Sequence, residues 1–147
     1  MPTAAKLVAG LALAVTAAVA ALVFLNGGGT NMPLGLGFVA GNAAVGFFTG
    51  WFTLGRNPGH GVMSAAFNGL RTLVLLLIAS GVVFSTLFVG RNLNNVTLRD
   101  PVDLPLLWIQ TAFDYVVDAL MRDVVIALLI GGVLSGVLAY LAGRRWT

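Results

Sequence analysis

The chain has 147 residues, of which 59% are hydrophobic and only 9% are charged, whereas soluble domains carry about a quarter charged residues. This composition predicts one all-α membrane domain over residues 1–147, with about four spanning helices because each needs roughly 20 apolar residues. The net charge is +3, but the Lys and Arg residues are scattered or lie at the ends of apolar runs, so they indicate topology rather than nucleic-acid binding. The chain has no cysteine, which excludes disulfides, thiolate metal sites and thiol redox chemistry.

The expected membrane spans lie at residues 7–25, 34–54, 70–89 and 124–142. A helical lead-in over 62–69, near the interface, precedes the third span. The first run has an alternative interpretation as a cleavable signal peptide, because its start is positive and Ala18-Val19-Ala20 resembles a cleavage site. Its apolar run exceeds the roughly 7–15 residues of a signal core, which favours a span.

The charges are distributed unequally between the two sides of these spans. Basic residues at one side are Lys6, Arg56, Arg144 and Arg145, with Arg71 half a turn inside the third span near the same interface. The five acidic residues on the other side are Asp100, Asp103, Asp114, Asp118 and Asp123. The positive-inside rule therefore predicts that both termini of this multi-pass protein are cytoplasmic, although Arg91, Arg99 and Arg122 weaken the bias. Trp51 and Trp146 near inner ends and Trp108 in the outer segment fit aromatic belts.

Small residues recur at four-residue spacing in three of the four spans. The pairs are Gly37 and Gly41, Gly46 and Gly50, Gly81 and Ser85, and Gly132 and Gly136. Such pairs place small side chains on one helix face and allow close helix packing in lipid. Asn42 shares a face with Gly46 and Gly50, and we expect it to make an interhelical hydrogen bond rather than to bind a ligand.

An amphipathic helix is expected over residues 104–121, between the third and fourth spans. Its polar stripe contains Asp103, Gln110, Asp114 and Asp118. The opposite apolar side contains Leu106, Leu107, Trp108, Ile109, Phe113, Val116, Val117 and Leu120. This pattern is typical of a helix that lies along the membrane surface or caps the bundle. Asp114 and Asp118 could bind a divalent cation or a basic partner, but a solvated face with a helical Asp118–Arg122 pair explains them more simply.

No residue pattern predicts an enzyme or a bound cofactor. His60 is the sole histidine, and the expected topology puts it across the membrane from every carboxylate, which forbids a His-carboxylate site within one chain. A small oxyanion could instead be held by Arg56, His60 and Arg71 with glycine N–H groups of the 55–61 turn. A basic turn that only fixes topology is the simpler interpretation.

Several short motifs lie in order along nearly the whole chain. They are the opening MPTAAKLVA, Gly50-Trp51, Gly55-Arg56, Gly59-x-Gly61, Asn68-Gly69-Leu70, Asp100-Pro101-Val102, Gly131–Gly136 and Arg144-Arg145-Trp146. This ordered set resembles the TrgA-type tellurite-resistance membrane proteins of alphaproteobacteria. The outer connection with Leu104-Pro105 and the Gly-rich first loop depart from the family pattern. The resemblance implies an integral inner-membrane protein associated with tellurite tolerance, without a known catalytic mechanism.

Two functions follow from these features. One is non-enzymatic tellurite resistance through limited oxyanion uptake or through export. The other is a structural accessory subunit of a larger inner-membrane complex, suggested by the small-residue faces and the aromatic-rich surface helix. Partners would be the lipid bilayer and other membrane-protein subunits or a second copy of the chain.

Overall fold

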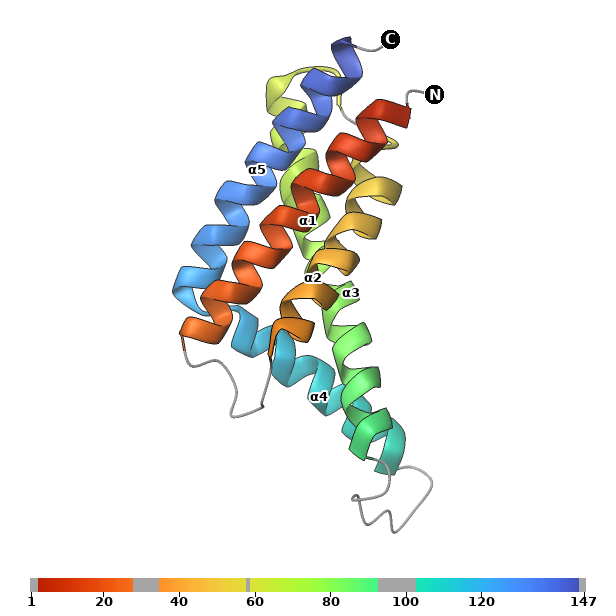
Figure 1. Ribbon diagram of the computed structural model, residues 1–147, viewed down its shortest axis with the longest axis vertical. Helices are drawn as coiled ribbons and strands as arrows, with labels where there is room; N and C mark the ends of the chain where they lie inside the picture. Colours follow the sequence, from red (N-terminus) through yellow and green to blue (C-terminus); the bar gives the residue numbers. More distant parts are fainter. Residues whose placement is uncertain (1–2, 28–34, 58, 93–102, 146–147) are drawn as a thin grey trace.

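The computed structural model describes residues 3–27, 35–57, 59–92 and 103–145, and these residues form helices and turns without any strand (Figure 1). The elements are α1 (Thr3–Asn26), α2 (Leu36–Thr49), η1 (Gly50–Leu54), α3 (Val62–Asn92), α4 (Asp103–Ala119) and α5 (Arg122–Arg145). The expected all-α class is therefore confirmed for these ranges. Most of the first loop, most of the outer connection and Trp146 lie outside the described residues.

Three helices are long and apolar enough to cross a membrane, namely α1, α3 and α5. Their outward sides carry large apolar residues such as Leu11, Ile78 and Leu134, each more than half exposed. Exposed apolar surface of this extent is typical of helices that contact lipid. The chain is thus a multi-pass membrane protein.

The second expected span is built from two helical pieces. The 14-residue α2 runs directly into the five-residue π-helix η1, so one helical segment continues from Leu36 to Leu54. A π-helical turn is wider than an α-helical turn, and here it is closed by the Gly55 N–H, which donates to the carbonyl oxygen of Gly50, five residues earlier, at 2.8 Å. Thr49 and Thr53 hydroxyls donate to the carbonyls four residues earlier, of Val45 and Thr49, a pattern that bends helices.

α1 lies between α2 and α5, and α3 packs against α5 and α4 (Figure 1). The main core brings together one face of each helix around α1. Its buried members are Leu13, Ala17, Ala20, Ala21, Phe24, Phe38, Leu73, Leu76, Val124 and Leu128. α4 crosses the end of the bundle opposite both chain ends, as expected of a capping helix (Figure 1).

Glycines bring the helix backbones into direct contact at two interfaces. A Cβ atom on Gly46 or Gly50 would lie within 2.7 Å of the Leu13 or Ala9 carbonyl oxygen of α1. On the other side of the bundle, a Cβ on Gly136 would lie 2.2 Å from the Ala65 carbonyl oxygen of α3. Van der Waals contact at these faces holds the bundle together, since lipid supplies no hydrophobic driving force between helices.

Not every residue of the small-residue pairs lies at such an interface. A Cβ on Gly37 would meet no other atom within 4 Å, because Gly37 lies in the first turn of α2 and is exposed. Gly37 therefore takes no part in packing among the described helices. Gly41 faces the Phe84 ring, and Gly81 faces α4 at Val116, so these two glycines accommodate side chains of other helices.

Candidate functional site

The basic turn between η1 and α3 has a defined backbone. Gly59 has a φ of +89°, a conformation that favours glycine, and a Cβ there would lie 2.9 Å from the Ala65 backbone nitrogen. The Asn68 side-chain amide donates to the Asn57 carbonyl oxygen at 3.1 Å. The turn is therefore fixed against the first two turns of α3.

Two of the three predicted oxyanion contacts lie on this turn, and both are exposed. Arg56 and His60 make no hydrogen bond or ion pair with the described residues. Gly55 packs closely against the Lys6 backbone, because a Cβ atom added to Gly55 would lie 2.6 Å from the Lys6 Cα. The turn and the start of α1 therefore form one cationic end of the bundle.

Arg71, the third predicted contact, lies far from that end. It is nine residues into α3, about 14 Å along the axis from Val62 at 1.5 Å per residue. Its neighbours Gly69 and Leu73 both contact Gly132, near the middle of α5. A span that begins at Leu70, as the sequence predicts, would put Arg71 near the membrane interface. In the structure α3 already packs against α5 at Ala65, so Arg71 lies deeper. No oxyanion site shared by Arg56, His60 and Arg71 is formed.

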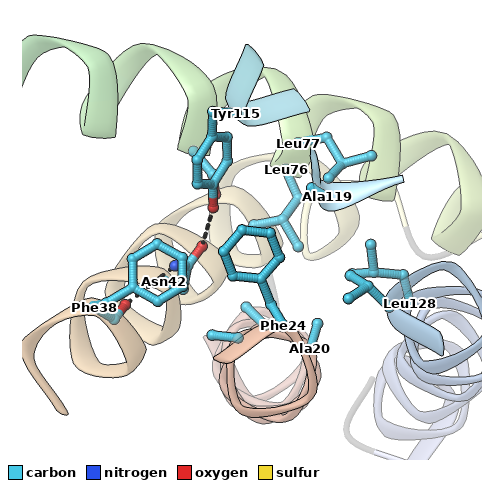
Figure 2. A pocket seen from close by; sticks show the side chains of 13 residues that line it. Ala20, Phe24, Phe38, Asn42, Leu76, Leu77, Tyr115, Ala119 and Leu128 are labelled. Atoms are coloured by element: carbon cyan, nitrogen blue, oxygen red, sulfur yellow. Dashed lines mark hydrogen bonds between the residues drawn. The ribbon is translucent and has the colours of Figure 1, made fainter. Parts of the chain in front are cut away.

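A hydrogen-bonded pair is buried where α4 meets the bundle (Figure 2). The Tyr115 hydroxyl donates to the Asn42 side-chain oxygen at 3.1 Å, and the Asn42 amide donates to the Phe38 carbonyl at 3.1 Å. Asn42 thus links α2 to α4. Burial raises the pKa of Tyr115, on the capping helix, to about 12, so its hydroxyl stays protonated at neutral pH and serves as a hydrogen-bond donor.

A cavity of about 30 Å³ adjoins this pair and is lined by residues from all five α-helices, including Phe24, Asn42, Leu76, Tyr115 and Leu128 (Figure 2). One water molecule needs about 10–15 Å³ of cavity volume. The cavity therefore has room for about two water molecules, and an oxyanion with its ligands would not fit.

A second buried polar contact joins α1 to α5. The Thr16 and Ser135 hydroxyls lie 3.1 Å apart, and Thr16 also donates to the Ala12 carbonyl at 3.0 Å. These groups are satisfied within the bundle and carry no charge. They fasten helices together and leave no polar atom aimed at a ligand.

α4 differs from its predicted two-sided pattern. Trp108 donates to the Thr86 hydroxyl at 2.9 Å, and Tyr115 and Val116 also face the bundle. The exposed apolar residues form a separate flank consisting of Leu106, Ile109, Phe113, Val117 and Leu120. The expected apolar side is therefore divided between the bundle and the outside.

The acidic residues of α4 form no ligand cluster in the part of the chain that the structure describes. Asp114 is exposed and Asp118 is half-buried. The predicted Asp118–Arg122 helical pair does not form, because α4 ends at Ala119 and a new helix begins at Arg122.

Comparison with known protein families, with curated proteins and with solved structures finds no match to this chain. The site must therefore be interpreted from its chemistry alone. That chemistry consists of exposed cations at one end, neutral hydrogen-bonded pairs inside, and one arginine at mid-depth.

The sequence alone does not identify Tyr115, Thr16 and Ser135 as hydrogen-bonding partners. Asn42 within an apolar run did signal that a hydrogen-bonding partner must exist. Nothing in the sequence identified Tyr115 as that partner, because it lies 73 residues away on the capping helix.

Proposed function

We propose that this protein is a four-span inner-membrane protein of the tellurite-resistance type, and that it acts as a non-enzymatic accessory subunit of a larger membrane complex. The observation that carries the proposal is the bundle interior. Its buried polar side chains within the described residues are neutral Thr, Asn and Ser. Such an interior supports holding helices in place rather than moving ions or performing chemistry.

The proposed fourth span is the continuous segment formed by α2 and η1. At 1.5 Å per residue it is about 28 Å long, close to the roughly 30 Å hydrocarbon thickness. With this span, both described chain ends and the basic turn lie at the same end of the bundle (Figure 1). Lys6, Arg56 and Arg145 are at that end, which supports cytoplasmic termini under the positive-inside rule.

Transport by this chain alone has little support from the interior. Proton and ion carriers place ionisable groups inside the bundle or along a water-filled path. Here Arg71 is exposed on the outer surface of α3, and the cavity beside Asn42 has room for only about two water molecules. Reduction of tellurite by this chain would also need a thiol or a redox cofactor, and the chain has no cysteine.

One observation favours a second candidate, direct handling of the oxyanion at the cytoplasmic end. Arg56 and His60 are exposed on a turn rich in glycine, and Gly55 of the same turn contacts Lys6. Exposed cations and backbone N–H groups of such a turn can attract an anion. This candidate requires that resistance depend on Arg56 and His60.

The accessory role is tested by extracting the full chain from its native membrane with a mild detergent and measuring the mass of the particle. We expect a particle containing at least one other membrane protein in a fixed ratio to this chain. The control is the same extraction after a harsh detergent, which should release the chain alone. A free monomer under mild conditions, with no partner captured by chemical crosslinking, would refute the accessory role.

A further inference from the structure

One cation lies on the outer surface of the bundle at mid-depth. Arg71 is exposed and makes no hydrogen bond or ion pair with the residues that the structure describes. The same face of α3 carries Phe67, Val74 and Ile78, which are 62%, 58% and 55% exposed. The opposite face, with Gly69 and Leu73, packs against α5. Arg71 therefore points directly away from the bundle.

The depth of Arg71 follows from contacts on three helices. Gly69 and Leu73, on either side of Arg71, contact Gly132 of α5. Gly132 lies about 15 Å from Arg122 and about 18 Å from Arg144 along the helix axis. On α1, Thr16 is level with Gly131 and Ser135, and it lies near the middle of its own helix. Arg71 is therefore level with the centre of the membrane-spanning bundle.

An unpaired guanidinium at this depth is unfavourable in lipid. Arginines within spanning segments are rare, and nearly all face the bundle interior or a water-filled cavity, or pair with another group. The side chain leans toward the helix N-terminus, which brings the charge somewhat closer to the cytoplasmic end. Arg71 lies about 14 Å from the start of α3, as estimated from the helical rise. Its charge is therefore at the level of Phe67 and Val74 rather than at the level of the lipid headgroups.

We propose that the α3 face formed by Phe67, Arg71, Val74 and Ile78 is the docking site for a membrane-spanning helix of another protein that carries an aspartate or glutamate at mid-depth. A second copy of this chain cannot supply that carboxylate. Its five acidic residues all fall within residues 100–123. The four that the structure describes, Asp103, Asp114, Asp118 and Asp123, lie in α4 or at the start of α5, at the end of the bundle where the two helices join. Charge complementarity therefore selects a different protein as the occupant. The inference rests on the proposed accessory role and identifies the surface that performs it.

The test places a photoreactive phenylalanine analogue at Phe67 or at Val74 of the full chain in its native membrane. Matched controls carry the analogue at Leu11 of α1 and at Leu134 of α5, which are 51% and 56% exposed on other faces. Each adduct is identified by mass spectrometry down to the crosslinked segment. The measurement is repeated with Arg71→Leu and with Arg71→Lys at equal membrane abundance.

We expect Phe67 and Val74, but not the two control positions, to crosslink to one membrane protein whose attached segment has a carboxylate at mid-span. Arg71→Leu should lower the yield by about tenfold, the size expected for one interhelical polar contact, while Arg71→Lys should retain most of it. Replacing the partner's carboxylate by its amide should reproduce the loss.

Three results would overturn the inference: adducts with lipid or with a second copy only, a partner segment without a carboxylate, or a yield that Arg71→Leu leaves unchanged. If mild extraction finds a partner but the α3 face captures none, the docking site is wrong and the accessory role stands. If extraction finds a free monomer, the accessory role itself fails.

Discussion

Gly69→Ala is expected to destabilise the bundle by about 3 kcal/mol, at the upper end of the usual cost of overpacking. The added Cβ would lie 2.1 Å from the Gly132 carbonyl oxygen and 3.3 Å from the Gly136 Cα. Both neighbours are backbone atoms, so no side-chain rotation relieves the clash and α3 must move away from α5. The Ala65–Gly136 contact one turn earlier would be lost with it.

The measurement is the free energy of unfolding in mixed lipid and detergent micelles as denaturing detergent is added. Gly37→Ala is the matched control, because the same methyl group on α2 meets open space and alanine favours a helix over glycine. The control should be neutral or slightly stabilising. Equal stability of the two variants would show that α3 and α5 do not pack through Gly69.

Tyr115→Ala is expected to release α4 from the bundle, with a loss of about 3 kcal/mol or more for truncation of a large aromatic side chain. The Tyr115 ring has its centroid 6.3, 6.1 and 5.6 Å from the rings of Phe24, Phe38 and Phe84. These contacts join α4 to α1, α2 and α3. Their removal would also leave the Asn42 side-chain oxygen without its donor.

Amide hydrogen exchange along α4 measures this release, since local opening raises exchange in the affected helix first. Phe113→Ala provides the control on the same helix, because that ring is 67% exposed. Tyr115→Phe separates the hydroxyl from the ring and should cost only about 1 kcal/mol. If the amide hydrogens of α4 exchange at the same rates in Tyr115→Ala and in Phe113→Ala, Tyr115 does not anchor α4.

The helical fold could be predicted because apolar runs and charge positions are properties of short stretches. The runs at 7–25 and 124–142 lie within α1 and α5, and the amphipathic pattern at 104–121 corresponds closely to α4. The sequence predicts a third span from Leu70 with a helical lead-in over 62–69, and the structure has one continuous helix from Val62. Ala65 and Gly69, within the lead-in, pack against α5, so this stretch belongs to the bundle.

The site could be predicted less well, because its features depend on which helices become neighbours. Four-residue spacing identified Gly132 and Gly136, but it also selected Gly37, which faces open space. The spacing is the same in both cases, and only the position of the neighbouring helix distinguishes them. The mid-depth position of Arg71 likewise follows from the alignment of α3 with α5, which composition does not encode.

Tellurite uptake and resistance in matched cells test the central claim, that this chain acts through partner proteins and does not bind the oxyanion itself. The comparison needs cells that lack the chain, cells that express it, cells that express Arg56→Ala with His60→Ala, and cells that express Arg71→Leu, all variants at equal membrane abundance. The account predicts that this variant confers the same resistance and the same uptake as the unaltered chain, whereas Arg71→Leu loses the resistance. Lost resistance together with raised uptake in the Arg56 and His60 variant would contradict the account and assign oxyanion handling to the basic turn.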